Sequence, residues 1–393
     1  MKIYKLNIII ICTLSSLLFI SCTETYPLLT NTYEEAIVVE ATITNELKYQ
    51  EIKITKTARF EDENYLPESG AEVFITDDTG NQYKFKEDSD RYVSITEFQA
   101  VPERKYQLHI NTKDGKSFES SPEYLTAVSP IQSLTTAVET KDKAKGIAIR
   151  VNSFDASAKS KYYKYEYEET YKVVAPKWSS IKVTLDENGR FVFSQNSTDK
   201  IVCYASKKNT ELLLTDTNNL TEDRVDFMVR FIDKQDYITT TRYSILVKQY
   251  IISLPSYSYN TTLKKMAGSG NILAPNQPGL LLGNLRSVNN PSNKIVGYFD
   301  VASVSSERIY FNHNDLFPNE LPPPYIVDCD QFCYGGEGEV PVPCTHQLPL
   351  LDDFVFGLIT FHSSGTSHIY WVNAPCGDCT KIASNIKPPF WVD

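Results

Sequence analysis

Residues 162–171 read Tyr-Tyr-Lys-Tyr-Glu-Tyr-Glu-Glu-Thr-Tyr, in which aromatic and charged side chains alternate from Tyr163 to Glu168. Successive side chains of a β-strand point to opposite faces, so the tyrosines share one face and the charges the other. The two sets are Tyr163, Tyr165 and Tyr167 against Lys164, Glu166 and Glu168. We expect a strand of a β-sandwich with its tyrosines turned toward the core. The alternative interpretation is a platform on which a ligand stacks.

The composition of the whole chain favours the same fold class. The 393 residues include 25 Tyr and 19 Phe but only three Met, a mixture typical of strands rather than helices. The formal net charge is -10, and removing residues 1–21 would take away Lys2 and Lys5 and no acid, leaving about -12. This balance argues against nucleic acid or anionic lipid as a partner. We therefore predict an all-β protein.

Upstream of the tyrosine-rich strand, residues 33–127 contain short strands at regular spacing. Residues 71–76 and 82–86 flank Asp77-Asp78-Thr79-Gly80-Asn81, which is typical of a hairpin turn, and residues 105–110 alternate. This spacing predicts an N-terminal immunoglobulin-like or transthyretin-like sandwich.

Residues 128–393 are expected to form a second sandwich-type domain with one inserted helix. Strands are predicted at 146–151, 162–171, 225–232 and 242–252, with a hairpin around Asn188-Gly189. The helix is expected near 253–267, capped by Ser253 and stopped by Gly268 and Gly270. Farther on, Pro, Gly and Asn are frequent, and we predict a loop-rich part with a strand pair at 296–301 and 308–311.

The N-terminus has the pattern of an export signal. Lys2 and Lys5 precede an apolar run, and Leu18-Phe19-Ile20-Ser21 leads directly to Cys22. The pattern resembles a bacterial lipoprotein signal, in which this cysteine becomes the first mature residue and carries acyl chains. We expect a signal peptide at 1–21, lipidation at Cys22 and a tether over 22–32. An ordinary secretory signal with an incidental cysteine is the alternative.

Six further cysteines lie in the exported part of the chain. They are Cys203, Cys329, Cys333, Cys344, Cys376 and Cys379, five of them within the segment 329–393. An oxidising compartment favours three disulfides, whose pairing stays open among fifteen possibilities. A zinc site using Cys329, Cys333, Cys376 and Cys379, with His346 as a possible ligand, is one alternative. A redox-active Cys376-Gly377-Asp378-Cys379 is another.

No catalytic motif emerges from the sequence. Gly-x-Ser-x-Gly, His-Glu-x-x-His, Gly-x-Gly-x-x-Gly and P-loop patterns are all missing. His362 and His368 flank a turn and are expected to decorate it rather than hold a metal. The acid pairs Asp352-Asp353 and Glu168-Glu169 are expected to be solvated or capping residues. We therefore expect no enzyme, no cofactor and no metal.

Several segments taken together resemble the Bacteroidota lipoprotein family called domain of unknown function 4249. The segments are Ile37-Val38-Val39-Glu40, residues 162–171, residues 243–250 followed by the Ser253 helix, Gly283-Asn284-Leu285, Gly297-Tyr298-Phe299 with 301–309, and Cys376-Gly377-Asp378-Cys379 through Lys387-Pro388-Pro389-Phe390-Trp391. The chain departs from the family pattern at Lys381-Ile382-Ala383-Ser384, where a Gly-rich step is usual.

The resemblance implies a function, although no activity is established for the family. Its members look like accessory lipoproteins of TonB-dependent, SusC-like receptors in nutrient uptake. The expectation is therefore a non-enzymatic binding protein, lipid-anchored in the outer membrane and facing outward, with a ligand of unknown class. A surface metal-dependent hydrolase using the Cys- and His-bearing C-terminal part, and an adhesin-like structural module, are the alternatives.

Overall fold

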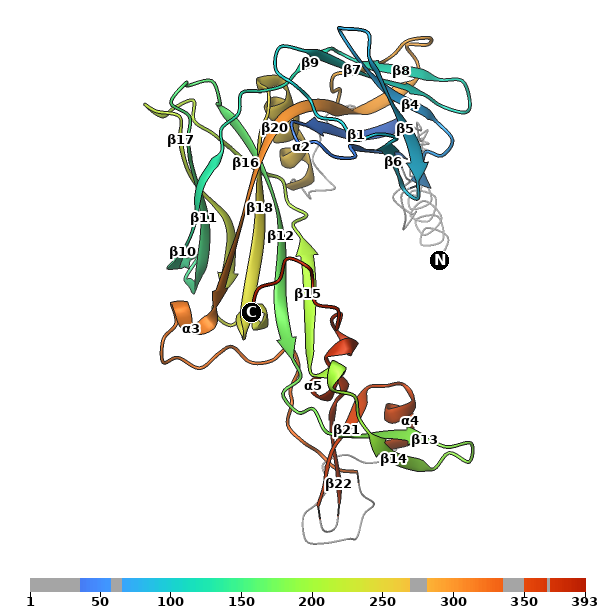
Figure 1. The fold of residues 1–393 in the computed structure, drawn as a ribbon, viewed down its shortest axis with the longest axis vertical. Coiled ribbons are helices and arrows are strands. Elements are labelled where there is room, and N and C mark those ends of the chain that lie inside the picture. The colour runs from blue at the N-terminus through green and yellow to red at the C-terminus, as the bar shows by residue number, and fades with distance from the viewer. Residues whose placement is uncertain (1–35, 58–65, 269–280, 335–349, 366–367) are drawn as a thin grey trace, which may run out of the picture.

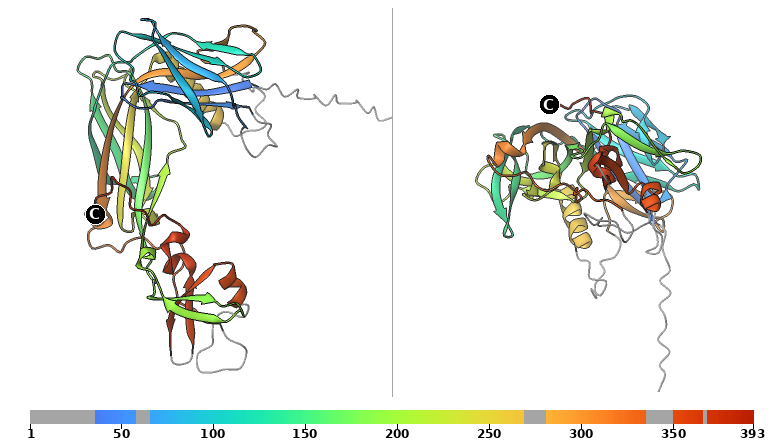
Figure 2. Two further views of the ribbon diagram at one scale, coloured as in Figure 1. Left: turned by 45° about the vertical axis from the view of Figure 1, so that its right-hand side comes forward. Right: turned by 90° about the horizontal axis from the view of Figure 1, so that it is seen from below.

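The computed structural model describes residues 36–57, 66–268, 281–334, 350–365 and 368–393, and it has an all-β architecture. Figure 1 shows three lobes stacked along the long axis: an upper sandwich, a middle sandwich and a smaller distal lobe. Figure 2 shows the upper sandwich projecting sideways from the top of the middle one. The all-β prediction is confirmed.

The upper sandwich is a rolled sheet that is antiparallel except for the parallel pair β1–β20, and the chain returns to it after it has built the middle lobe. Its core is aliphatic and aromatic, with Ile43, Ile54, Ile75 and Phe118 fully buried. Its strands are β1 (Ala36–Thr44), β2 (Glu51–Lys56), β3 (Leu66–Pro67), β4 (Glu72–Asp77), β5 (Gln82–Asp88), β6 (Arg91–Ser94), β7 (Lys105–Asn111), β8 (Ser117–Ser120), β9 (Glu123–Tyr124), β19 (Leu285–Ser287) and the first half of β20 (Lys294–Asn312).

The middle lobe packs a three-stranded sheet against a larger one around a second core. The small sheet is β10 (Ile131–Lys141), β11 (Ala144–Phe154) and β17 (Arg224–Asp233). The large one contains β12 (Tyr162–Val174), β15 (Val202–Lys208), β16 (Leu213–Asp216), β18 (Arg242–Ile251) and the second half of β20. Tyr163 and Tyr165 of β12 are fully buried between the sheets, which confirms the sandwich-strand interpretation of this segment.

Helix α2 (Leu254–Gly268) lies where the upper and middle lobes meet, as Figure 1 shows. The Ser253 hydroxyl accepts a hydrogen bond from the Ser256 N–H at 3.2 Å, as expected for a capping residue. Pro255 stands in the first turn, where its missing N–H costs nothing. The predicted helix is thus confirmed within one residue at each end.

One strand joins the upper and middle lobes. The strand pair predicted at 296–301 and 308–311 was therefore wrong. Residues 296–301 and 308–311 belong to the single 19-residue strand β20. Its first half pairs in parallel with β1, from Ala36↔Lys294 to Thr44↔Ala302. Its second half pairs antiparallel with β18, from Ile251↔Ser303 to Arg242↔Asn312. The strand keeps full pairing because it changes partner at residues 302–303 instead of turning.

The distal lobe is a small unit of two hairpins and short helices around its own aromatic core. Phe191, Phe354 and Phe361 surround the buried Trp371, with ring centroids 5.6–6.2 Å from it. The predicted hairpin at Asn188-Gly189 is confirmed and belongs to this lobe. The elements of this lobe are β13 (Ile181–Leu185), β14 (Phe191–Gln195), α4 (Leu350–Val355), β21 (Ile359–Ser364), β22 (Ile369–Asn373) and α5 (Ala374–Gly377). The remaining short elements of the described residues are connections: η2 (Thr198–Lys200), η3 (Tyr237–Thr239), α3 (His313–Leu316) and η4 (Cys379–Lys381).

Candidate functional site

A cleft of about 1060 Å³ lies where the continuous sheet bends at β20. One wall is the outer face of the upper sandwich, formed by β1, β2 and the start of β20. The other wall is the outer face of β12 and β18 in the middle lobe, and helix α2 contributes Tyr259, Asn260 and Leu263. The cleft is therefore a product of the bend, and its walls come from segments far apart in the chain, such as β1 and β18.

Strand alternation decides which side chains reach the upper wall. In β1, Ile37, Val39, Ala41 and Ile43 enter the core, which leaves Val38, Glu40 and Thr42 on the cleft side. The β1–β20 register sets Glu40 beside Tyr298 and Thr42 beside Asp300.

The lower wall carries the charged face of the tyrosine-rich strand. The Lys164 ammonium lies 3.4 Å from Glu166 Oε1 and 4.9 Å from the centre of the Tyr250 ring. The Tyr250 hydroxyl donates to Glu166 Oε2 at 3.0 Å. Burial, and then the charge of Glu166, raises the pKa of Tyr250 well above its usual range. These three residues form a fixed patch with an anion, a cation and an aromatic ring in contact.

Asp300 is the most unusual titratable group of the cleft. It is 6 % exposed, and Ser256 Oγ donates a 2.9 Å hydrogen bond to its Oδ2 from the first turn of α2. Burial raises the pKa of Asp300 to about 6, against the attraction of Lys164 and the bond from Ser256, which both lower it. The carboxyl therefore changes charge near neutral pH.

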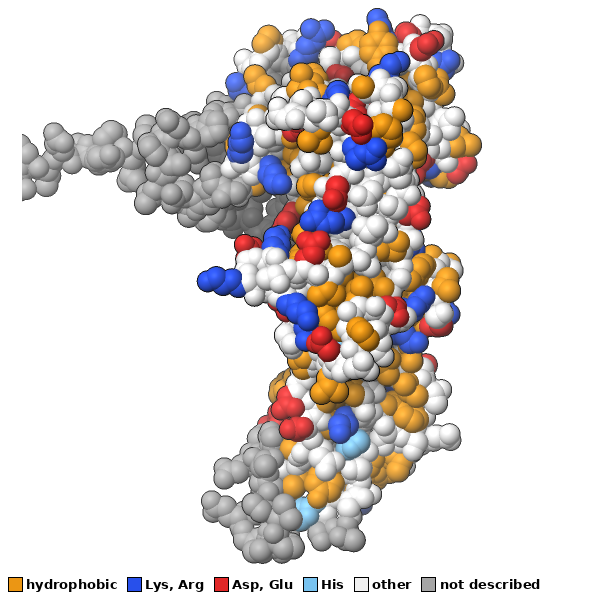
Figure 3. Space-filling view, turned by 90° about the vertical axis from the view of Figure 1, so that its left-hand side faces the viewer, with side chains coloured by type: hydrophobic (Ala, Val, Ile, Leu, Met, Phe, Trp, Pro, Cys, Tyr) orange, Lys and Arg blue, Asp and Glu red, His pale blue; other side chains and the backbone are white. Residues whose placement is uncertain are grey.

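The cleft as a whole is close to electrically balanced, although the chain is acidic. Six basic side chains line it: Lys48, Lys53, Arg91, Lys164, Lys208 and Lys248. Seven acidic ones accompany them: Glu40, Glu51, Asp90, Glu166, Glu168, Glu211 and Asp300. Figure 3 shows the same interleaving of both charges over one face of the upper and middle lobes. Such a lining offers both donors and acceptors but no net attraction for a strongly charged ligand.

A second pocket of about 430 Å³ lies beside α2, and Tyr259 and Tyr298 line both spaces. Asn284 builds its floor: the amide nitrogen donates to Glu123 at 2.9 Å and to the Phe299 carbonyl at 3.0 Å, and the Phe299 N–H donates to the amide oxygen at 2.8 Å. Gly297 has φ +134°, and a Cβ there would lie 2.1 Å from the Val39 carbonyl oxygen. The glycine is required because β1 and β20 approach closely at this point.

Four of the predicted disulfide cysteines lie between the middle and distal lobes. Cys203 pairs with Cys379, and Cys329 pairs with Cys376. Cys333 is also disulfide-bonded, whereas Cys344 and Cys22 fall outside the described residues, as does His346. The disulfide prediction is thus confirmed for these pairs. Cys376 and Cys379 bond to different partners, which removes the redox pair, and both are unavailable to zinc.

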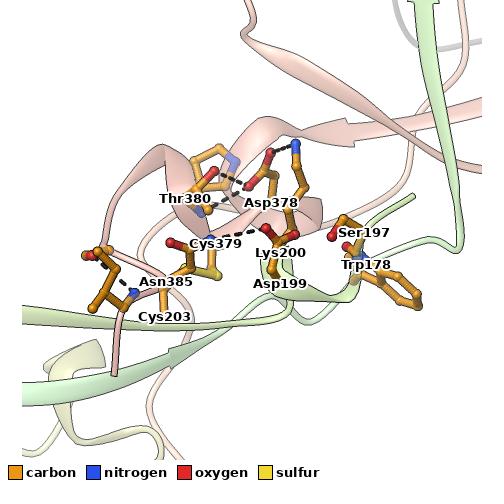
Figure 4. Close-up of a disulfide and its surroundings, with 12 residues drawn as sticks. Trp178, Ser197, Asp199, Lys200, Cys203, Asp378, Cys379, Thr380 and Asn385 are labelled. Atoms are coloured by element: carbon orange, nitrogen blue, oxygen red, sulfur yellow. Dashed lines mark hydrogen bonds and ion pairs between the residues drawn. A yellow bond between two sulfur atoms is a disulfide. The ribbon is translucent and has the colours of Figure 1, made fainter. Parts of the chain in front are cut away.

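Figure 4 shows the Cys203–Cys379 disulfide beside the ion pair of Lys200 and Asp378. Lys200 Nζ lies 2.7 Å from Asp378 Oδ2, and the Thr380 N–H donates to Oδ1 at 3.0 Å. Burial raises the pKa of Asp378, but the bonds from Lys200 and Thr380 outweigh it, so the pKa is lowered overall. The ion pair and hydrogen bonds beside this disulfide indicate a structural role for it.

The other candidates serve structure. Glu169 was expected to be solvated, but it lies on the inward face of β12, where it is buried. Arg230 Nε donates to it at 3.0 Å and the Tyr243 hydroxyl at 2.7 Å. His362 Nδ1 lies 3.2 Å from the Lys177 carbonyl, and Asp353 accepts from Tyr334 at 2.6 Å. Among the described residues no group of three His, Cys, Asp or Glu side chains is arranged to hold a metal.

A comparison with family models decides the classification. The model described as "Domain of unknown function (DUF4249)" matches residues 23–308. The chain belongs to the DUF4249 family. The match begins directly after Cys22 and ends within β20, so the DUF4249 region contains both walls of the cleft and helix α2, whereas β21 and β22 of the distal lobe follow it.

The other comparisons add no function to this DUF4249 member. No curated protein matches the sequence. Among solved structures, "Biofilm associated protein - B domain" aligns over 70 % of this chain and 85 % of its own, with 8 % identity and a TM-score of 0.14. In the parts of the chain that the structure describes, no helix has the length and apolar character needed to cross a membrane.

The sequence reasoning missed the cleft itself. Asp300, Ser256 and Lys248 were not singled out, because they become neighbours only through the bend at β20. The alternation in residues 162–171 was a usable signal, since it placed Lys164 and Glu166 together on the face that became the lower wall.

Proposed function

We propose that this DUF4249 protein is a non-enzymatic binding protein, anchored by lipid at Cys22 in the outer membrane and facing outward, that serves a TonB-dependent, SusC-like receptor in nutrient uptake. The observation that carries the proposal is the inter-lobe cleft. Its two walls belong to one hydrogen-bonded sheet, and its space of about 1060 Å³ is at the upper end of small-molecule sites.

The chemistry of the cleft supports binding over catalysis. Its charges are interleaved and several are already paired, as Lys164 is with Glu166 and Arg91 is with Glu51. The metal-dependent hydrolase considered above would use cysteines that are bonded in pairs. The membrane anchor and the receptor rest on the lipoprotein signal and on the family resemblance.

Co-purification of the native lipidated protein from its own outer membrane tests the proposal. A tag would be placed at the C-terminus, the membrane solubilised gently, and the eluate quantified by mass spectrometry. We expect a TonB-dependent receptor in near-equal amount. Recovery of the lipoprotein alone, with the receptor detected in the unbound fraction, would contradict the accessory role.

A further inference from the structure

The strands β1, β12 and β18 present their faces to the cleft, whereas Lys208 in its lining belongs to β15, the terminal strand of the sheet. β1 is paired with β2 and β20, β18 with β12 and β20, and β12 with β18 on one side and with β15 and β16 on the other. The backbone N–H and C=O groups of these strands are therefore already bonded to each other. These three strands therefore offer no edge for strand addition, the mode that gives peptide recognition its main-chain hydrogen bonds.

On these strands recognition therefore comes from side chains, and these alternate donors with acceptors. Lys164 and Glu166 are neighbours along β12, and the β12–β18 register sets Glu166 beside Lys248. On the opposite wall Glu40 is paired in register with Lys53. A ligand with many hydroxyls, each able to donate and accept, matches such a surface, whereas a ligand with one kind of charge meets repulsion as often as attraction.

Aromatic rings add apolar surface to the same space. Tyr49 is 53 % exposed at the cleft, and the half-buried Tyr259 of α2 packs against the buried Tyr298 of β20 with ring centroids 5.7 Å apart. A tyrosine combines a flat apolar ring with a polar tip and binds at low entropic cost. Sugar rings have the complementary form, with an apolar face and hydroxyls at the edge.

Asp300 is an acid kept in place at a cost to stability. Its carboxylate is buried, and an uncharged residue of the same shape would avoid the desolvation penalty. Destabilising groups of this kind are characteristic of functional sites. Asp300 lines the cleft, accepts from Ser256 and feels the charge of Lys164, which suits an acceptor for ligand hydroxyls.

We infer that the ligand class of this cleft is a neutral oligosaccharide, held by Glu166, Asp300 and Lys164 and stacked on Tyr49 and Tyr259. The inference rests on the proposed binding function and narrows it to one chemical class.

Titration calorimetry of the full mature chain in detergent tests the inference without the receptor. The probes are maltohexaose, cellohexaose, xylohexaose, mannohexaose and laminarihexaose, with a mixture of neutral hexapeptides as the competing class. We expect at least one oligosaccharide to bind and the peptides to give no heat. In Glu166→Gln and Asp300→Asn we expect about tenfold or greater weakening, the effect of losing a hydrogen bond to a charged group.

Glu187→Gln is the matched control, because Glu187 is exposed in the distal hairpin and far from the cleft lining. It is expected to bind like the wild type. Asp300→Asn is expected to be more stable than the wild type, so weaker binding by this variant cannot come from unfolding. Binding by the hexapeptides alone, by none of the six probes, or equally by all variants would overturn the inference. The receptor co-purification is a separate experiment, so its failure is distinguishable from failure of the oligosaccharide assignment.

Discussion

At the residue scale, Asp300 is expected to make the stability of the protein depend on pH. Its pKa is about 6 in the folded protein against an ordinary 3.8, so the folded state holds this proton more tightly than the unfolded chain does. The stability that the neutral carboxyl contributes is complete below about pH 4 and is lost as the pH rises to about 6. Asp300→Asn should therefore raise the free energy of unfolding at pH 7.5 by as much as about 3 kcal/mol, and much less at pH 4.

Urea unfolding of the wild type and of Asp300→Asn at both pH values measures this effect. An equal change in stability at pH 4 and pH 7.5 would show that the carboxyl does not titrate in this range.

Gly297 provides a second test at the residue scale. In Gly297→Ala the new Cβ would meet the Val39 carbonyl oxygen at 2.1 Å, so β1 and β20 must separate, and we expect a loss of about 3 kcal/mol or more. Gly80→Ala is the matched control: Gly80 also has positive φ, but nothing lies within 4 Å of its Cβ position, and we expect a loss of about 1–2 kcal/mol. Thermal unfolding of both variants compares them, and equal losses would mean that the close approach does not matter.

The sequence predicted the roles of individual residues well where those roles depend on neighbouring positions in the chain. Ser253 as a cap and Tyr163 and Tyr165 as core residues follow from spacing alone. Glu169 was misjudged because a charged residue on the inward face needs a buried partner, and Arg230 lies 61 positions away. The pairing of Cys203 with Cys379 could not be predicted either, since the spacing of six cysteines does not determine which of them form disulfides with each other.

At the scale of elements, β20 explains both the success and the failure of sequence reasoning. Hairpins such as β13–β14 are set by their own turn residues and were predicted. β20 pairs with β1, more than 250 positions earlier, and then with β18. The sequence of β20 contains no signal that identifies either partner strand. The cleft depends on that change of partner, so the site could not be foreseen even where its residues could.

The Cys203–Cys379 disulfide connects β15 to the C-terminal segment, which continues across the middle lobe. The backbones of Tyr204 and Ser384 bond to each other at 2.7 and 3.1 Å, and Trp391 packs on the Tyr204 ring at 5.1 Å. Because the bridge closes a separation of 176 residues, the double variant Cys203→Ala/Cys379→Ala should lose about 3–5 kcal/mol.

Thermal unfolding, with limited proteolysis of the C-terminal segment, measures the loss of this disulfide. The double variant Cys329→Ala/Cys376→Ala is the comparison, because its bridge closes only 47 residues and a smaller loss is expected. An unchanged unfolding temperature and unchanged proteolysis after removal of Cys203–Cys379 would contradict its role as a staple.

At the scale of the whole molecule, we propose a lipid on Cys22 and a ligand in the cleft between the upper and middle lobes. Cys22→Ala should remove the acyl chains and release the protein from the membrane, because these chains are the proposed attachment to the bilayer. Fractionation of cells into membrane and soluble parts measures this, with Cys12→Ala as the control within the signal. Membrane retention of Cys22→Ala would contradict lipid anchoring at this position.

Hydrogen exchange of the mature protein, with and without the oligosaccharide that binds most tightly, tests the central claim most directly. The account predicts slower exchange in residues 209–212 and 49–50, which border the cleft outside its strands, and no change in residues 350–358 of the distal lobe. Protection confined to the distal lobe, or binding without protection around the cleft, would contradict the claim that the bend at β20 is the binding site.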